Sequence, residues 1–470
     1  MFFRPDNSVA ADVIPFYRNG TYQLFYLRDY RNTEIYGEGT GWELIETQDF
    51  VHFEEKGEVI TKGSEQDQDL YVYTGCAFMK DEVSYLFYTG HNPYFTDSGR
   101  SQEVILRAVS RDCIKWEKDL DFCLHAPACF EVHDFRDPFI FYHEERREYC
   151  MLLAARKKNG SYRRSGCTAI ATSKDLNQWT VLEEPFYAPD MYYTHECPDL
   201  FQMGEWWYLV FSEFTDKFET HYRMSRSWNG PWVTPQQDTF DNRSFYAAKT
   251  VSDGKNRFII GWNPTNCDNR DFSELQWGGN IVVHQIVQGE DGKLFVKIPD
   301  TVKEAYPLPQ KYQVTDTTGI VKEIKNGWEI GRADGYSGID LSRLCRKCRF
   351  SFDVTFYGKG LSFFICLKSG ELCYSVEIDT GFERMVFDRW PRKRNDHPFI
   401  LESERKISVK ENERYHMELI RDDSVLEIYL DDRYAMSARM NEDIEGVFGF
   451  AVSYGVVRVE GLKYLLPEDR

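Results

Sequence analysis

A seven-residue phrase recurs in this chain at a constant interval. It begins at Thr47, Ser110 and Ser173, so both steps are 63 residues long (110 − 47 and 173 − 110). Each copy reads hydroxyl residue, any residue, Asp, three residues, aromatic residue. A repeat of this period indicates an array of similar units and argues against an ordinary single-core domain. The repeat therefore constrains the fold before any catalytic residue is considered.

Short aromatic and aliphatic runs form a second series beside the phrase. They lie at residues 22–26, 85–88, 149–153, 207–211 and 257–262. Such runs, bounded by turn residues, are typical of buried strands, and the Asp of the phrase suits a turn between strands. Five strand-rich units predict an all-β fold, with a five-bladed β-propeller over residues 1–305. A β-sandwich with chance similarity among its turns is the alternative, which two equal steps disfavour.

The repeat fades after about residue 300, and a different strand pattern follows. Apolar and polar residues alternate at 415–419 and 426–430, and acidic pairs at 422–423 and 431–432 supply turn residues. Alternation of this kind predicts strands with one buried face and one solvent-facing face. Residues 306–470 are therefore predicted to form a C-terminal β-sandwich of normal domain size.

The chain is strongly acidic, with a formal net charge of −19. This charge argues against nucleic acid and against anionic membranes as partners. The first residues lack a secretory signal, and no apolar stretch reaches the roughly 18 residues that would suggest a membrane span. Twelve cysteines lie mostly within strand runs, where a reduced thiol behaves as a small apolar residue. We therefore expect a cytoplasmic protein with free thiols.

Two cysteine patterns resemble the spacing of metal ligands. Cys345 and Cys348 form a CxxC pair without a second pair at zinc-finger spacing, and a mixed run of Cys and His extends from residue 123 to 133. Both patterns are common in proteins that bind no zinc. We expect no metal and no organic cofactor.

Three of the predicted inner strands carry a carboxylate, namely Asp12, Asp137 and Glu196. The innermost strands of a propeller converge, so residues at the same place in successive units are brought together. One such residue alone could be a structural ion pair, as Arg136 beside Asp137 suggests. Three at matching places favour an active site, because clustered carboxylates push their pKa values apart. Glycoside cleavage requires such a pair of differently protonated carboxyl groups.

At these residues the chain resembles glycoside hydrolase family 32, the family of invertases, inulinases and levanases. Arg136, Asp137 and Pro138 match the Arg-Asp-Pro motif of that family, and Glu196 and Cys197 match its Glu-Cys motif. Further similar segments lie at residues 42–53, 73–77 and 245–248. The resemblance spans both predicted domains and implies a five-bladed propeller followed by a β-sandwich.

The resemblance also implies roles for individual residues. Asp12 is expected to be the nucleophile, Asp137 the stabiliser of the transition state and Glu196 the acid/base. The residues expected to bind the substrate are Arg136, Trp42, Cys197, Thr74, Tyr246 and Trp277. Trp42, and Trp277 less specifically, would pack against the apolar face of a sugar ring.

The first motif of the family is altered in this chain. Residues 8–15 keep Asp12 but lack the Trp, the Asn and the Pro-Asn-Gly of the family pattern. Asp6 is a rival nucleophile, although it lies too far from the predicted strand. His195 stands where a Trp often precedes the acid/base of the family. We therefore expect the rim and the subsites of the active site to differ from those of invertases.

The sequence thus predicts a retaining glycosidase that cleaves β-fructofuranosidic bonds in sucrose or short fructo-oligosaccharides, with hydrolysis and fructosyl transfer left open. One alternative is a related propeller enzyme that acts on arabinosides or xylosides. Another is a non-catalytic carbohydrate-binding protein on the same scaffold. The expected partner is a small carbohydrate, and a homodimer contact is one expected role of the second domain.

Overall fold

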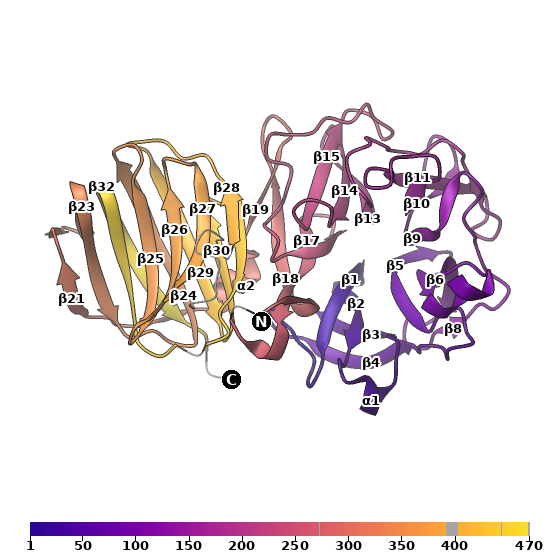
Figure 1. The fold of residues 1–470 in the computed structure, drawn as a ribbon, viewed down its shortest axis with the longest axis horizontal. Coiled ribbons are helices and arrows are strands. Elements are labelled where there is room, and N and C mark those ends of the chain that lie inside the picture. The colour runs from indigo at the N-terminus through magenta and orange to yellow at the C-terminus, as the bar shows by residue number, and fades with distance from the viewer. Residues whose placement is uncertain (272, 392–402, 443, 469–470) are drawn as a thin grey trace. The chain divides into compact units, whose positions relative to one another are not determined.

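The chain is built almost entirely of β-strands in a computed structural model, which describes residues 1–271, 273–391, 403–442 and 444–468 (Figure 1). It divides into two compact units. The first unit comprises Phe3–Trp262 and Gly278–Leu294, and the second comprises Met1–Phe2, Asn263–Trp277 and Phe295–Arg470. Each unit is assembled from more than one segment of the sequence, so the predicted division at residue 305 stays a prediction.

The first unit is a β-propeller whose strands pair antiparallel in consecutive groups. In chain order the groups hold β1 (Val9–Arg18), β2 (Thr21–Asp29), β3 (Trp42–Thr47) and β4 (Glu54–Ile60); β5 (Tyr71–Lys80), β6 (Val83–His91), β7 (Glu103–Ser110) and β8 (Glu117–Lys118); β9 (Phe130–His143), β10 (Glu148–Lys157), β11 (Gly166–Ser173) and β12 (Thr180–Val181); β13 (Glu196–Met203), β14 (Trp206–Glu213) and β15 (Glu219–Ser225); and β16 (Tyr246–Ser252), β17 (Arg257–Asn266), β18 (Leu275–Gln288) and β19 (Leu294–Lys297). Short helical turns are α1 (Thr33–Tyr36) and η1 (Pro93–Ser98), and η2 (Cys267–Asn269) lies in the segment that belongs to the second unit.

The start of the chain is joined to the last strand group of the propeller. Ala10 of β1 pairs with Gly279 of β18, and the Ile281 amide donates a hydrogen bond to the Phe3 carbonyl at 2.8 Å. The first and last groups therefore share one eight-stranded sheet. This pairing closes the propeller, and the predicted number of five blades stays a prediction.

The repeated phrase forms the same hydrogen-bonded turn in all three copies. In the first copy the Thr47 hydroxyl accepts from the amides of Asp49 and Phe50, and the Asp49 carboxylate accepts from the amides of Val51 and His52. The copies at 110 and 173 repeat all four bonds, and the twelve distances lie between 2.8 and 3.3 Å. The prediction of a turn between strands is confirmed.

The inner strands of the propeller contact one another in the order β1, β5, β9, β13, β16 and back to β1 (Figure 1). Each of them breaks its register with the next strand, in segments that contain Asp12, Thr74, Asp137, Cys197 and Ala247. All of these except Thr74 have a positive φ, between 41° and 57°. Such bulges bend a strand and re-aim its side chains. A similar bulge thus recurs in each inner strand around the propeller, and these bulges position predicted site residues such as Asp12, Thr74 and Asp137.

The second unit is a β-sandwich, which confirms the predicted fold of the C-terminal part. Its elements are α2 (Asp300–Glu304), β20 (Leu308–Pro309), β21 (Val314–Thr318), β22 (Val321–Ile324), β23 (Gly327–Ser342), β24 (Lys347–Tyr357), β25 (Ser362–Ser369), β26 (Leu372–Asp379), β27 (Arg384–Trp390), β28 (Ser403–Lys406), β29 (Arg414–Asp422), β30 (Val425–Leu430), β31 (Tyr434–Arg439) and β32 (Val447–Leu466). The long β32 pairs with β23, β24 and β25, and so ties the unit together.

One expectation about the sandwich is wrong. The alternating positions of β29 and β30 were expected to leave one face in water, but Glu418, Glu427 and Tyr429 are all at most 2% exposed. Glu418 is tolerated inside because Arg349 holds it through two hydrogen bonds, at 2.5 and 2.9 Å. Within the described residues, no helix combines the length and the apolar character that crossing a membrane requires.

Candidate active site

Asp12 lies in the bulge of β1, and both of its carboxylate oxygens accept a hydrogen bond. The Thr74 hydroxyl donates to Oδ2 at 2.6 Å, and the Trp262 indole N–H donates to Oδ1 at 2.9 Å. The two donors come from β5 and β17, so three different strands fix the orientation of one side chain. The two hydrogen bonds fix the orientation of the Asp12 carboxylate and stabilise its anionic form.

Burial raises the pKa of Asp12 to about 6. The hydrogen bonds from Thr74 and Trp262 oppose this rise because they stabilise the anion, and so does the positive charge of Lys249. The nearby Glu196 raises the pKa of Asp12 further. Asp12 is therefore ionised above about pH 6 and sits within the field of a second carboxyl group.

Asp137 is the most buried of the three predicted catalytic carboxyl groups, at 4% exposure of the residue. Its Oδ2 accepts from the Cys197 amide at 2.9 Å, and its own amide donates to the Thr89 hydroxyl at 2.8 Å. Burial raises the pKa of Asp137 to about 6, against the opposing effect of the Arg136 guanidinium. The bulges of β9 and β13 are thus joined at this carboxylate.

Glu196 begins β13 and is held by two donors. Arg136 Nη2 donates to Oε1 at 3.0 Å, and the Tyr246 hydroxyl donates to Oε2 at 2.5 Å. Burial raises the pKa of Glu196, and the neighbouring Asp137 raises it too, whereas Arg136 and Tyr246 lower it. The side chain keeps 20% of its surface exposed. Glu196 can therefore carry a proton and still reach a ligand.

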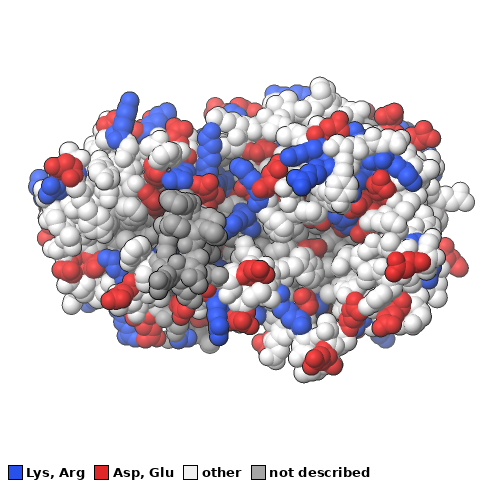
Figure 2. Space-filling view, in the orientation of Figure 1, with Lys and Arg blue, Asp and Glu red and all other residues white. Residues whose placement is uncertain are grey.

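Figure 2 shows the propeller face hollowed where the inner strands of Figure 1 meet, with acidic side chains inside the hollow. The charges of Asp12, Asp137 and Glu196 shift one another's pKa values, so the three groups form one electrostatic cluster. Asp6, the rival nucleophile, is exposed, and its backbone carbonyl accepts from Ser8 and Arg28. The structure thus brings together the three predicted carboxylates and leaves Asp6 outside their cluster.

The predicted stacking role of Trp42 is wrong. Trp42 has no exposed surface, and its indole N–H donates to the Tyr73 carbonyl at 3.2 Å. Its ring packs among Phe25 and Tyr88, so no face is left for a sugar. Trp42 thus supports β5, the strand that carries Tyr73 and the adjacent site residue Thr74. The sequence pattern could not distinguish a core tryptophan from a ligand-binding one.

The other predicted binding residues differ in position. Thr74, Cys197 and Tyr246 are buried and bond to the three carboxylates, so they position these groups. Arg136 lies beside Glu196 and is 9% exposed. Trp277 is half-buried in β18 and belongs to the second unit, and its contact with a sugar stays a prediction.

Several residues of the cluster were not predicted. Trp262 was recognised only as part of a strand, and Glu103 was not singled out at all. Glu103 Oε2 accepts from Arg136 Nη1 at 3.3 Å and from the Phe135 amide at 2.9 Å. Lys249 is 2% exposed and donates to the Pro198 carbonyl at 3.1 Å. A charged residue inside an apolar strand was the available signal for Lys249, since such a group needs a counter-charge.

His195, which precedes Glu196, is completely buried against the Phe211 ring, with 4.3 Å between ring centroids. Burial lowers the pKa of His195 to about 3, so the imidazole is neutral. Its Nδ1 lies 3.3 Å from the Thr168 hydroxyl. His195 therefore anchors the start of β13 through packing and carries no charge to the site.

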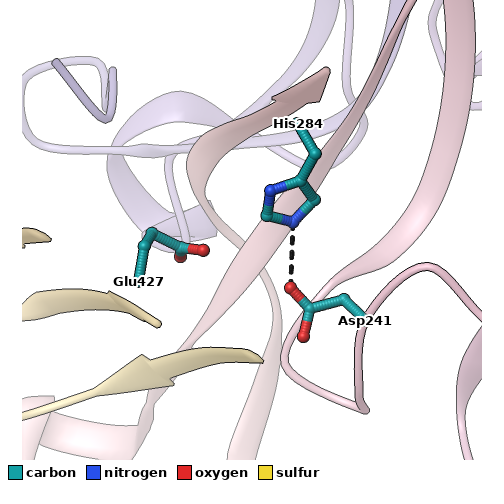
Figure 3. Close-up of side chains that lie close together, drawn as sticks. All are labelled: Asp241, His284 and Glu427. Carbon is teal, nitrogen blue, oxygen red and sulfur yellow. Dashed lines mark hydrogen bonds and ion pairs between the residues drawn. The ribbon is translucent and has the colours of Figure 1, made fainter. Parts of the chain in front are cut away.

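Figure 3 shows a second buried pair in the propeller, in which His284 Nε2 and Asp241 Oδ2 lie 2.9 Å apart. Such a bond satisfies two polar groups that have no access to water. Glu427, also drawn, belongs to the second unit and accepts from the Ser437 hydroxyl at 2.9 Å. All twelve cysteines of the chain are free thiols.

The raised pKa of Asp12 predicts a change in stability. Unfolded aspartate has a pKa of about 4, so wild type loses stability as the pH rises from about 4 through about 6. Asp12→Asn removes this buried charge, and we expect it to be more stable than wild type by about 2 kcal/mol at pH 7.5 and almost equally stable at pH 4. Urea unfolding at both pH values measures the difference. A stability gain independent of pH would contradict the raised pKa.

Comparisons with known proteins agree with this geometry. Residues 3–297 match the glycosyl hydrolases family 32 N-terminal domain. The sucrose-6-phosphate hydrolase of Zymomonas mobilis is 24% identical to this chain over 459 residues, which cover 92% of this chain and 84% of that protein.

Two solved structures share the fold. The exo-inulinase of Aspergillus awamori superposes with a TM-score of 0.73 at 17% identity, covering 100% of this chain and 98% of that one. The β-fructofuranosidase of Bombyx mori gives 0.69 at 18% identity, covering 97% and 91%. At such identities these structures establish the fold alone. The family match covers more than half of the chain, and the chain therefore belongs to glycosyl hydrolases family 32 and is a glycosidase.

Proposed function

We propose that this enzyme hydrolyses β-fructofuranosidic bonds in sucrose or short fructo-oligosaccharides by a retaining double displacement. Asp12 is the nucleophile, Glu196 the acid/base and Asp137 the stabiliser of the transition state. One observation carries the proposal: two carboxyl groups of one cluster have different environments. Both oxygens of Asp12 accept from donors that stabilise its anion, whereas burial and the neighbouring Asp137 raise the pKa of Glu196, whose side chain stays 20% exposed. Such a division of environment is how a pair of carboxyl groups divides the two roles.

In the first step Asp12 attacks the anomeric carbon while Glu196 protonates the leaving oxygen. The carbon–oxygen bond to the leaving group breaks as the ester bond to Asp12 forms. In the second step Glu196, now ionised, takes a proton from water, and the oxygen of that water displaces Asp12. Fructose leaves with its configuration retained, and both carboxyl groups return to their starting states.

Arg136 and Asp137 support this chemistry from one side. Arg136 lies between Glu103, Asp134 and Glu196, at 3.0 to 3.3 Å from each carboxylate. The positive charge of Arg136 favours the ionised form of the neighbouring carboxyl groups. Asp137, ionised above about pH 6, opposes the positive charge that develops on the sugar ring.

The choice of fructosides rests on the relatives. One relative is a sucrose-6-phosphate hydrolase, and two of the structural neighbours are an exo-inulinase and a β-fructofuranosidase. A cytoplasmic location belongs to the same proposal, and twelve free thiols support it.

A homodimer stays a prediction, which light scattering tests by measuring the mass of the protein in solution.

Sugar release from a panel of substrates tests the proposed function. The panel holds sucrose, kestose, inulobiose, levanbiose, phosphorylated sucrose, and aryl arabinofuranosides and xylosides. Release of fructose supports the proposal. Release of pentose instead would overturn it in favour of an arabinosidase or xylosidase, and silence across the panel would favour a carbohydrate-binding protein.

Loss of the Trp262 hydrogen bond is expected to shift the pH dependence. Trp262→Phe removes a donor that stabilises the Asp12 anion, so the pKa of Asp12 rises and the acidic limb of kcat/KM moves up by about one pH unit. Profiles of kcat/KM between pH 4 and 9 measure this shift.

Trp116→Phe is the matched control, because its buried indole N–H has no hydrogen-bond partner among the described residues. This variant also replaces an indole by a phenyl ring, but it removes no donor to Asp12. The acidic limb of its kcat/KM profile should therefore stay in place. An unmoved limb in Trp262→Phe would show that the indole does not tune Asp12.

A further inference from the structure

One lysine is buried among the inner strands of the propeller. Lys249 belongs to β16, which contacts β1 and β13, and the residue is 2% exposed. Its Nζ donates to the Pro198 carbonyl at 3.1 Å and lies 5.5 Å from the centre of the Phe139 ring. Pro198 follows Glu196 by two residues, and Phe139 follows Asp137 by two residues. The ammonium group therefore lies between the strands that carry two of the three catalytic carboxyl groups.

The ammonium group of Lys249 is poorly paired for so buried a charge. An ammonium group has three N–H donors. Among the described residues of the propeller, Lys249 makes the one hydrogen bond to Pro198 and no ion pair with a carboxylate. A buried charge is costly unless other charges compensate for it. The compensation must therefore come from carboxylates that do not touch the lysine.

Asp12 and Asp137 share the field of this lysine. Burial raises the pKa of both carboxyl groups to about 6, and the positive charge of Lys249 opposes the rise in each. The same charge opposes the rise that burial causes in the thiol pKa of Cys76 and of Cys197. These four groups come from β1, β9, β5 and β13. One ammonium group thus acts on all four of the other inner strands.

Glu196 depends on a different cation. Burial raises the pKa of Glu196, whereas Arg136, which donates to Oε1 at 3.0 Å, lowers it together with Tyr246. Arg136 also acts on Asp137, but the strongest cationic influence on Asp12 is Lys249. The two buried cations therefore serve the proposed acid/base and the proposed nucleophile separately.

Asp199 is the other buried carboxylate near this lysine, and it has partners of its own. It is 1% exposed, and its Oδ2 accepts from the Thr250 amide at 2.6 Å. Arg257 of β17 lies in the field of Asp199 and donates to the Thr250 hydroxyl at 2.8 Å. Among the described residues, no ion pair joins Asp199 to Lys249. These contacts favour the catalytic carboxylates as the counter-charge of Lys249.

We propose that Lys249 is a positioning residue for the reaction, a buried cation that keeps Asp12 and Asp137 ionised while Glu196 still carries its proton. This inference rests on the proposed function and deepens it. Lys249 touches no substrate and acts through the two carboxylates, by its charge and not by its hydrogen bond. A retaining mechanism needs carboxyl groups in two different protonation states, and this cation helps to separate them.

Two substitutions distinguish the charge of Lys249 from its hydrogen bond. Lys249→Met removes both, whereas Lys249→Gln removes the charge and keeps a donor for the Pro198 carbonyl. In profiles of kcat/KM for sucrose between pH 4 and 9, the acidic limb should move up by about one pH unit in both variants, because the Asp12 anion loses a stabilising charge. The basic limb, which follows Glu196, should move less, because Arg136 still acts on that group.

Arg257→Met is the matched control, because it removes a cation of the adjacent strand that lies in the field of Asp199. Both limbs of its profile should stay in place. A shift in Lys249→Met that is absent from Lys249→Gln would overturn the proposal and assign the lysine to its hydrogen bond. Unmoved limbs in both lysine variants would overturn it as well.

Urea unfolding at pH 8.5 measures the same charge interaction without catalysis. Asp12→Asn is introduced into wild type and into Lys249→Gln. Without the lysine the pKa of folded Asp12 is higher, so ionised Asp12 costs more stability above that pKa. The gain from Asp12→Asn should therefore be larger in Lys249→Gln, by the equivalent of one pH unit, about 1.4 kcal/mol.

The two measurements separate the possible failures. An equal gain from Asp12→Asn in both backgrounds would overturn the proposal for Lys249. A larger gain in Lys249→Gln, found together with a wild type that is inactive on every fructoside, would overturn the proposed function and still confirm the charge interaction between Lys249 and Asp12.

Discussion

Asp12→Asn is expected to lower kcat on sucrose by at least about 10⁴-fold, because an amide cannot form the covalent intermediate of a double displacement. The loss should appear without unfolding, since the oxygen of the introduced amide can still accept from the Trp262 indole that now bonds to Oδ1 of Asp12. Initial rates of fructose release, measured at the optimum pH of wild type, give the ratio.

Asp6→Asn is the matched control for this experiment. Asp6 is an exposed aspartate that precedes Asp12 in the chain and lies outside the cluster. Its variant should keep at least about half of the wild-type rate, as surface substitutions usually do. A reversed result, with Asp6→Asn inactive and Asp12→Asn active, would move the nucleophile to Asp6 and refute the assignment.

Glu196→Ala should separate two substrates by the quality of their leaving groups. Sucrose needs protonation of its leaving oxygen, so kcat/KM for sucrose should fall by about 10³- to 10⁴-fold. β-D-Fructofuranosyl fluoride needs no proton for its first step, so its kcat/KM should fall far less. Azide, which needs no general base, should restore turnover of the fluoride by attacking the intermediate and should give a β-fructosyl azide.

Glu205→Ala provides the control, because Glu205 lies in the same strand group and its side chain is 86% exposed. It should behave as wild type on both substrates. Equal losses of Glu196→Ala on sucrose and on the fluoride would show that Glu196 does not act as the acid, and it would then be a structural partner of Arg136.

The fold could be predicted because its signals are periodic. The phrase at 47, 110 and 173 repeats one hydrogen-bonded turn, and hydroxyl and Asp side chains are needed there to bond the turn's own amides. The sandwich was visible in the alternation of β29 and β30. The burial of Glu418 was not, because it depends on Arg349, which is distant in the sequence.

The candidate site could be predicted in part for a similar reason. Asp12, Asp137 and Glu196 recur at matching places in their repeats, and the structure shows that bulges at these places are repeated as well. The role of Trp42 was predicted wrongly, because a tryptophan near a site motif is as typical of a buried core as of a sugar-binding surface. Lys249 and Glu103 were missed because their role lies in the charges that they face, and those charges belong to other strands.

Peptide mapping of the trapped intermediate tests the central claim most directly. Glu196→Ala is mixed with β-D-fructofuranosyl fluoride, quenched in acid and digested, and its peptides are weighed by mass spectrometry. The variant forms the intermediate without acid help but lacks the base that hydrolyses it, so the account predicts a fructosyl adduct on Asp12 in the peptide that contains β1. An adduct on Asp6 or on another residue, or turnover of the fluoride with an inverted product and no adduct, would contradict it.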